Sequence, residues 1–286
     1  LLIPGIIWYI IFAYLPMGGL SLAFKTYKTK LGIWGSPWVG FDNYIYVFRD
    51  HAFWQSIWKT LYINTGRMIF QFPAPIILAL MLNEFRMVRY KKALQTVYTF
   101  PHFLSWVVVA SIMTNILSMD GLVNNLIKSL GGTPYSFLGT SSTFVPLMYV
   151  TDIWKYSGYG SIIYLAAISG IDQEQYEAAD IDGASRWQKL CHITLPSILP
   201  TIIVMFIMTS GTMMSLGFDQ TFNMSNSAVK NAVEVLDMYI YRITFESVTD
   251  FSFSTAVSLF RSIANCLFLV LSDRLSRLMG GGGLLG

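Results

Sequence analysis

Side chains that commonly perform chemistry are few and scattered in this chain. The histidines His51, His102 and His192 and the cysteines Cys191 and Cys266 show no spacing typical of a metal site. They form no constellation of nucleophile and base either, so we expect no metal and no other cofactor to be bound by this chain. What recurs instead is a pattern of ionisable and hydroxyl side chains inside apolar stretches. Such residues are costly in a membrane and indicate a path for a polar solute or a buried pair.

Polar side chains at helical spacing mark four of these stretches. Ser258, Arg261 and Asn265 are separated by three and four residues, which places them on one face of a helix. Hydroxyls, amides and aromatic rings suit a sugar, because polar groups bond its hydroxyls and rings cover its C–H faces. The candidates for such a path are Arg67, Asp152, Trp154, Lys155, Tyr156, Thr212, Ser215, Asp219, Ser258, Arg261 and Asn265. The alternative is contact between helices, with Asp152 and Lys155 as a local ion pair.

The overall composition is that of a membrane protein. Of 286 residues, 54% are hydrophobic and 12% are charged, whereas a soluble domain has about 25% charged residues. The mean hydropathy of +0.52 excludes a disordered chain, a nucleic-acid-binding protein and an ordinary cytosolic enzyme. The net charge of +3 is too small to indicate an acidic partner. We therefore expect an all-α integral membrane protein with a single domain over residues 1–286.

Six stretches are apolar enough to cross a membrane, which takes about 20 residues. They are residues 1–24, 60–83, 96–118, 143–169, 194–217 and 254–279. Because the chain begins inside the first of them without an initiator Met, we expect an N-terminal piece to precede it.

Lysines and arginines set the expected orientation of these spans. Basic residues gather in three segments that alternate correctly to share the cytoplasmic side: Arg86, Arg89, Lys91 and Lys92, then Arg186 and Lys189, then Arg274 and Arg277. Lys25, Lys28 and Lys30 are the exception. This orientation places loops 25–59, 119–142 and 218–253 outside, and loop 170–193 and both termini in the cytoplasm. We expect a multi-pass protein of a bacterial plasma membrane.

The cytoplasmic loop 170–193 predicts two short helices. Asp172 is a good N-cap, with Gln175 three residues later as in a capping box. Gly183 ends the first helix, and Pro196 fits the first turn of the next span. The product is an amphipathic helix pair parallel to the membrane, whose small residues would let another protein approach closely. The alternative is a solvated interfacial helix.

The spacing of this loop resembles the EAA loop of ABC importer permeases. Glu177-Ala178-Ala179 is followed by Gly183 six residues after the glutamate, and Pro196 closes the pattern nineteen residues after it. Segments 32–40, 164–168, 236–242 and 253–260 are similar to the carbohydrate branch of these permeases, of the polysaccharide and alginate type. The resemblance implies a type I importer fold with a coupling helix that docks on an ATPase. Its docking residues would be Glu177, Ala178, Ala179, Asp182, Gly183, Ala184, Trp187, Leu195 and Pro196, with Glu177 in a salt bridge.

The same resemblance implies a function. The chain would be the transmembrane subunit of an ATP-driven importer that moves an oligo- or polysaccharide by alternating access. Its partners would be a second, different permease, two ATPase subunits that use ATP and Mg²⁺, and an extracytoplasmic solute-binding protein. No Gly-x4-Gly-Lys-Ser/Thr phosphate loop is present, so we expect no ATP hydrolysis by this chain itself.

Two other functions are compatible with an apolar chain. An ion-coupled secondary transporter would be expected to show interrupted helices in two matching halves, a pattern that the sequence lacks. A membrane-embedded enzyme would need a catalytic constellation. The sequence leaves the sugar open, since Arg67, Lys155 and Arg261 could suit an acidic one while Asp152 and Asp219 oppose it.

Overall fold

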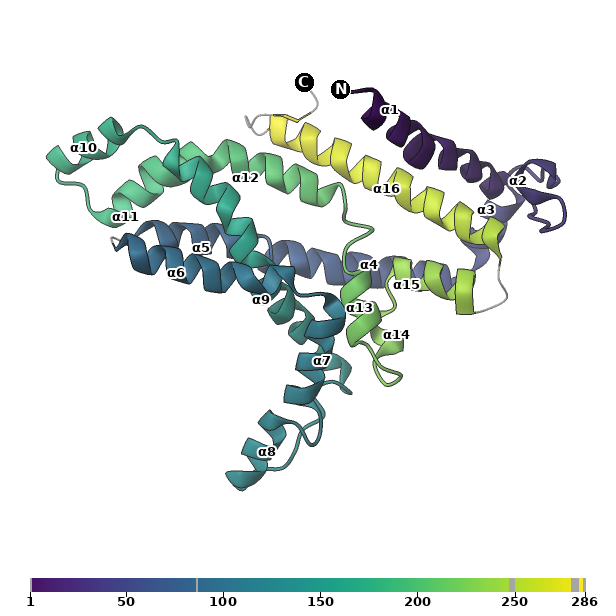
Figure 1. The fold of residues 1–286 in the computed structure, drawn as a ribbon, viewed down its shortest axis with the longest axis horizontal. Coiled ribbons are helices and arrows are strands. Elements are labelled where there is room, and N and C mark those ends of the chain that lie inside the picture. The colour runs from purple at the N-terminus through teal and green to yellow at the C-terminus, as the bar shows by residue number, and fades with distance from the viewer. Residues whose placement is uncertain (1, 86, 247–249, 279–282, 285–286) are drawn as a thin grey trace.

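The computed structural model describes residues 2–85, 87–246, 250–278 and 283–284, so Arg86 of the first basic segment lies outside the described residues. Helices make up most of this part of the chain (Figure 1). In order they are α1 Ile3–Tyr9, α2 Gly32–Gly35, α3 Asp42–Arg49, α4 His51–Phe70, α5 Pro73–Asn83, α6 Val88–Thr99, α7 Trp106–Leu117, α8 Leu122–Ser129, α9 Ser141–Ser169, α10 Gln173–Ile181, α11 Arg186–Lys189, α12 Leu195–Ser210, α13 Phe218–Met224, α14 Lys230–Val233, α15 Leu236–Tyr241 and α16 Phe251–Leu278. A π-helix at Ile10–Tyr14 and a 3₁₀ helix at Leu15–Phe24 extend α1. The all-α prediction is therefore confirmed.

Within the described residues, five helical segments are long and apolar enough to cross a membrane. They are Ile3–Phe24, His51–Asn83, Trp106–Ser129, Arg186–Ser210 and Phe251–Leu278. The sixth expected span corresponds to α9, a continuous helix of 29 residues and therefore about 44 Å long. Buried polar residues, Asp152 and Lys155 among them, make α9 less apolar than the other five. It packs against α4, α5, α6 and α12, so its polar groups face protein and not lipid.

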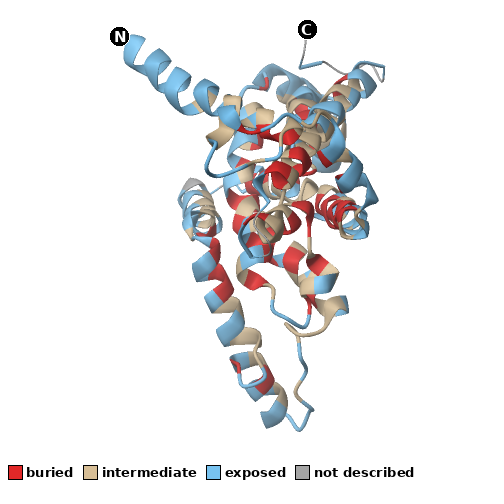
Figure 2. Ribbon diagram, turned by 90° about the vertical axis from the view of Figure 1, so that its right-hand side faces the viewer, coloured by how far each residue is buried: buried red, intermediate tan, exposed pale blue. Residues whose placement is uncertain are grey.

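The helices lie roughly along one axis of the molecule. In Figure 1, α10 and α11 occupy one end, and α2 and α3 lie at the opposite end. Helices α7 and α8 project away from the bundle, and Figure 2 shows buried residues gathered where the central helices cross. The first helix is almost wholly exposed, as suits a segment surrounded by lipid or by another chain.

The second span starts earlier than the predicted residue 60. Helix α4 begins at His51 because the side chain of Asp50 caps it, accepting a hydrogen bond of 2.8 Å from the backbone N–H of Ala52. The kink expected at Pro73 and Pro75 is confirmed. Helix α4 ends at Phe70 and α5 begins at Pro73, as proline cannot donate to the preceding turn.

The third span was wrongly predicted as one helix over residues 96–118. Helix α6 ends before Phe100, a 3₁₀ turn occupies Phe100–Phe103, and α7 starts after Ser105, which caps it through the N–H of Val108. Helix α6 then packs along α9, and α7 departs in another direction. Proline at position 101 and the extended backbone of Leu104 cause the break.

The fifth span also ends early, at Ser210 and not at residue 217. Residues 211–217 form irregular turns that reverse the chain into α13. The expected outer loop 218–253 contains α13, α14 and α15, which pack back onto α7, α9 and α4. Val229, Val233 and Leu236 are fully buried there. The buried apolar residues form three hydrophobic clusters, which include Phe53 and Tyr239, Phe144 and Met148, and Tyr164 and Ile198.

Candidate functional site

A buried ion pair links two of the membrane helices. Arg67 of α4 places its Nε 2.7 Å from Oδ2 of Asp152 on α9, and the two side chains are 3% and 4% exposed. The alternative of contact between helices thus holds for Asp152, but its partner is Arg67 and not the neighbouring Lys155. A charge taken out of water needs a close partner and further hydrogen bonds. The remaining donors of Arg67 do find such partners.

The Arg67 guanidinium is the centre of a buried hydrogen-bond network. Its Nη1 donates to Oδ1 of Asn64 at 2.7 Å and to the carbonyl of Leu216 at 3.2 Å. Its Nη2 donates to Gln220 of α13. The Gln220 amide in turn donates to Thr151 at 2.8 Å, on the helix that carries Asp152. One side chain thus ties α4, α9 and α13 together.

The turn 211–217 depends on side chains from neighbouring helices. Asn64 donates to the carbonyl of Met213 at 2.6 Å, and Asn265 of α16 accepts from the N–H of Met214 at 2.8 Å. Gly217 has φ +92°, and a Cβ there would collide with the Arg67 guanidinium. Irregular backbone at membrane depth survives only where protein groups satisfy it. Several polar residues of the predicted stripes therefore serve the break in the fifth span.

Lys155 performs a similar task at the break between α6 and α7. It is buried, and its Nζ donates to the carbonyls of His102, at 2.8 Å, and of Leu104. The same ammonium lies 5.6 Å from the ring of Trp106 and 5.2 Å from that of Tyr156. Lys155 consequently fixes the end of the 3₁₀ turn and holds it to α9.

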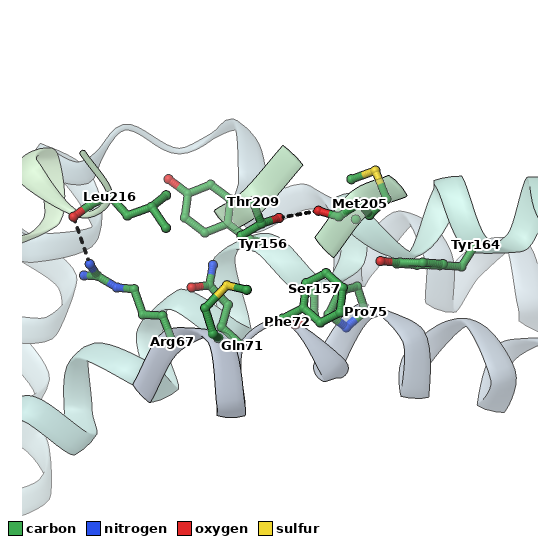
Figure 3. Close-up of a pocket in the computed structure, with 12 residues that line it drawn as sticks. Arg67, Gln71, Phe72, Pro75, Tyr156, Ser157, Tyr164, Met205, Thr209 and Leu216 are labelled. Carbon is green, nitrogen blue, oxygen red and sulfur yellow. Dashed lines mark hydrogen bonds between the residues drawn. The ribbon is translucent and has the colours of Figure 1, made fainter. Parts of the chain in front are cut away.

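Two cavities meet beside this network. The inner cavity has a volume of about 170 Å³. In Figure 3, Arg67 and Leu216 lie at one end of it and Tyr164 lies at the other. Its walls are mostly apolar and include Phe72, Pro75 and Met205, so it is suited to sugar C–H faces or to packing.

The outer cavity is larger and more polar, with a volume of about 380 Å³. Its lining residues are Arg67, Gln71, Trp106, Asp152, Tyr156, Ser215, Leu216, Gly217, Phe218, Asp219 and Gln220. Arg67, Gln71, Tyr156 and Leu216 line both cavities and so lie at their junction. Tyr156 accepts a hydrogen bond of 3.0 Å from the indole of Trp106. The arrangement provides hydrogen-bonding groups and aromatic rings around one continuous polar recess.

The structure brings together part of the predicted path. Arg67, Asp152, Tyr156, Ser215 and Asp219 line the outer cavity. Lys155 contacts Trp106 and Tyr156 of its wall, and Asn265 donates to Ser215 at 2.6 Å.

Other predicted path residues lie away from both cavities. Trp154 is 41% exposed on α9, and Thr212 and Ser258 line neither cavity. Arg261 of α16 forms an ion pair with Asp237 of α15. Burial raises the pKa of the Asp237 carboxyl, and the neighbouring Arg261 opposes this effect. Arg261 is thus placed as a tie between the last span and the outer segment.

Several cavity residues were not selected from the sequence. Gln220 and Phe218 follow the break at Gly217, and Trp106 starts α7 after an unforeseen break. Their position depends on where the chain turns, which the hydropathy pattern does not reveal. For Gln220 one signal was available, because it adjoins the selected Asp219.

The cytoplasmic loop forms the predicted pair of short helices. Asp172 caps α10 by accepting from the N–H of Glu174 at 3.0 Å, and Gly183 has φ +75° after α10. The reciprocal capping box is found at Ser185 and Gln188 of α11, not at Asp172 and Gln175. Nζ of Lys189 lies 2.6 Å from Oδ1 of Asp180, which joins α11 to α10.

One face of this helix pair is exposed, while Tyr176 of α10 packs against the cluster that contains Tyr164 and Ile198. No residue of α10 is buried. Ile181 is 87% exposed and Trp187 is 71% exposed. Glu177 is exposed too, and the described residues provide no ion-pair partner for it. Two apolar side chains and an unpaired acid on a projecting tip are suited to docking with another protein.

Comparison with known proteins assigns this architecture. Residues 71–279 match the family described as binding-protein-dependent transport system inner membrane component. The chain belongs to this family. The predicted ABC importer permease with a cytoplasmic loop of the EAA type is thereby confirmed, and the family assignment does not support the ion-coupled alternative. The permease is a transport component, and ATP hydrolysis belongs to a separate subunit.

Relatives cover almost the whole permease. Protein LplB of Bacillus subtilis is 44% identical over 270 residues, which are 94% of this chain and 85% of that protein. The polygalacturonan/rhamnogalacturonan transport system permease protein YteP of Bacillus subtilis is 39% identical over 99% of this chain and 88% of that protein. A crystal structure of a bacterial alginate ABC transporter in complex with an alginate pentasaccharide-bound periplasmic protein superposes with a TM-score of 0.90. It has 36% identity and covers 99% of this chain and 94% of that chain.

Proposed function

We propose that this permease moves an oligosaccharide, released from a polysaccharide and delivered by an extracytoplasmic binding protein, through the outer and inner cavities in turn. The observation that carries the proposal is their junction at Arg67, Gln71, Tyr156 and Leu216, beside a hinge-like turn at Gly217. Alternating access needs a constriction whose two sides open in turn. The names of YteP and of the alginate transporter support a polysaccharide-derived solute.

The charge of the solute is not selected by the basic residues of the spans. Arg67 is paired with Asp152, Arg261 is paired with Asp237, and Lys155 is bonded to carbonyls. Placing a substrate carboxylate against any of them would disturb an existing interaction, which is buried in the case of Arg67 and Lys155. Selection of an acidic sugar would therefore be made by the binding protein or the second permease.

The helix pair α10–α11 would be the coupling element. Glu177 would form a salt bridge in a groove of an ATPase subunit, with Ala178, Ala179, Asp182, Gly183 and Ala184 permitting close approach. Trp187 and Ile181 would be the apolar anchors, and Leu195 and Pro196 would lead the motion into α12. ATP and Mg²⁺ would be bound by the ATPase subunits, and this chain would bind no cofactor.

Uptake by the purified assembly in proteoliposomes tests the proposed function. Galacturonate, alginate and neutral oligosaccharides would be supplied with the binding protein, with ATP inside the vesicles. We expect ATP-dependent uptake of at least one of these solutes. Transport without ATP, or by the isolated chain, would overturn the proposal.

Substitution of Glu177→Lys or Gly183→Trp is expected to abolish uptake while leaving membrane insertion intact. Lysine at position 177 reverses the charge of the docking face. Tryptophan at position 183 adds a large side chain where the backbone φ is +75°, which favours glycine. Glu174→Lys is the matched control, because Glu174 is also exposed on α10 but precedes the motif by about one turn. Uptake would be measured together with co-purification of the ATPase. Full uptake by both variants would contradict the coupling role.

A further inference from the structure

We propose that four aromatic side chains form a ladder on which a saccharide slides from the outer end of the permease into the outer cavity. This aromatic ladder consists of Phe218 and Phe222 on α13, Tyr241 at the end of α15 and Phe245 on the following π-helix, Arg242–Glu246. The inference rests on the proposed saccharide function and specifies how the solute reaches the cavity.

The four rings are in continuous contact. The rings of Phe218 and Phe222 are stacked with centroids 5.4 Å apart and planes inclined by 25°. Tyr241 lies 4.9 Å from Phe222, and Phe245 lies 5.3 Å from Tyr241. Each step is therefore about one ring in length. A bound sugar could exchange one face for the next without crossing a gap between rings.

The ladder is continuous with the outer cavity. Phe218 lines that cavity beside Asp219, directly after the turn at Gly217. Phe222 lies one helical turn further along the same face of α13. In Figure 1, α13 lies at the centre of the molecule, and α15 extends from there toward the end that carries α2 and α3. The ladder thus leads from the end opposite α10 and α11 to the mouth of the recess.

Phe218 packs against the core cluster that contains Phe144 and Met148, whereas the other three rings lie outside the hydrophobic clusters of the described residues. Phe222 is 41% exposed and Phe245 is 67% exposed. The opposite faces of the same helices form the core, through buried Gln220 and Met224 on α13 and buried Leu236 on α15. Aromatic faces that remain accessible beside a polar cavity match the apolar C–H faces of sugar rings. A lipid-facing role would not account for the place of Phe218 in the wall of a cavity that Asp152 and Asp219 also line.

Chain-length dependence of uptake tests the ladder. The complete transporter would be reconstituted with its binding protein, and uptake of tri- and hexasaccharides from the imported series would be compared. Phe222→Ala and Phe245→Ala are expected to raise the apparent KM for the hexasaccharide about five- to tenfold. The trisaccharide should be affected less, because it spans fewer rings. Phe70→Ala is the matched control, since Phe70 is 55% exposed on α4 and lines neither cavity.

Conservative substitutions separate stacking from packing against another chain. Phe245→Trp keeps a flat ring and should restore uptake of the hexasaccharide, whereas Phe245→Leu keeps apolar volume and should not. If Phe245→Leu behaves as the original chain, or if the alanine variants lose the second permease on purification, the ladder is an interface and the proposal is overturned. Equal KM values in all variants overturn it as well. If the transporter without substitutions imports no oligosaccharide at all, the proposed function is overturned, and the proposal of the aromatic ladder is overturned with it.

Discussion

At the scale of single residues, Arg67 shows how a charge can be held inside a membrane bundle. Its guanidinium meets one carboxylate, two side-chain amides and one backbone carbonyl. These partners come from α4, α9, the turn 211–217 and α13. Arg67 and Asp152 are 85 positions apart in the sequence. Lys155, the partner that the sequence offered as an alternative, is three positions from Asp152. Spacing along one helix suggests only pairs within that helix. It does not reveal that the fold brings Arg67 of α4 next to Asp152 of α9.

The guanidinium of Arg67 leaves no room for a side chain at Gly217. Gly217→Ala is expected to lower the apparent midpoint of thermal unfolding of the purified assembly, through both its φ of +92° and collision with the guanidinium. The free energy of unfolding should fall by about 1–3 kcal/mol. Gly131→Ala is the matched control, because φ there is +80° but nothing lies within 4 Å of its Cβ. Equal shifts in the two variants would mean that backbone strain alone decides the effect.

At the scale of elements, Lys155 governs where α6 ends and α7 begins. It crosses from α9 to donate to carbonyls that no helix can satisfy at this break. Lys155→Met is expected to increase amide hydrogen exchange at residues 104–109 of the assembled transporter, because those carbonyls lose their donor. Lys128→Met is the matched control. Lys128 forms an exposed pair with Asp120, and such pairs contribute about 0–1 kcal/mol. Unchanged exchange in the Lys155 variant would assign the break to Pro101 alone.

The elements also show which features a sequence can predict. The α10–α11 loop was predicted well because its signals are local: Asp172 caps the helix through its own neighbours, and Gly183 takes a positive φ. The kink before Pro73 was predicted for the same reason. The breaks at Leu104 and at residues 211–217 were missed because the groups that satisfy them, Lys155, Asn64 and Asn265, lie on other helices. The cavity residues after these breaks were missed with them.

At the scale of the whole molecule, basic residues indicate the orientation in the membrane, and the structure gives one of the three exceptions, Lys25, a role of its own. Lys25 appeared to contradict the distribution, since it follows the first span on the outer side. Its Nζ donates to the carbonyls of Ile33 and Trp34 at 3.0 and 3.1 Å and lies 5.9 Å from the Trp34 ring. This lysine is used to fix the chain around α2. Its position is thus compatible with the outer side.

Labelling with a membrane-impermeant maleimide checks this orientation. In a background of Cys191→Ser and Cys266→Ser, intact spheroplasts should be labelled at Trp34→Cys, because Trp34 is 77% exposed at the α2 end. Ile181→Cys, at a position 87% exposed on α10, should react only after permeabilisation. Ile263→Cys on α16 is the control for a position that faces lipid. Maleimide reacts with the thiolate, which forms only in contact with water, so this cysteine should stay unlabelled under both conditions. The reverse pattern would invert the permease and move α10 and α11 away from any cytoplasmic ATPase. Because the five spans and α9 make an even number of crossings within the described residues, the same result would place the start of the first span and the end of the last span on the side of Ile181.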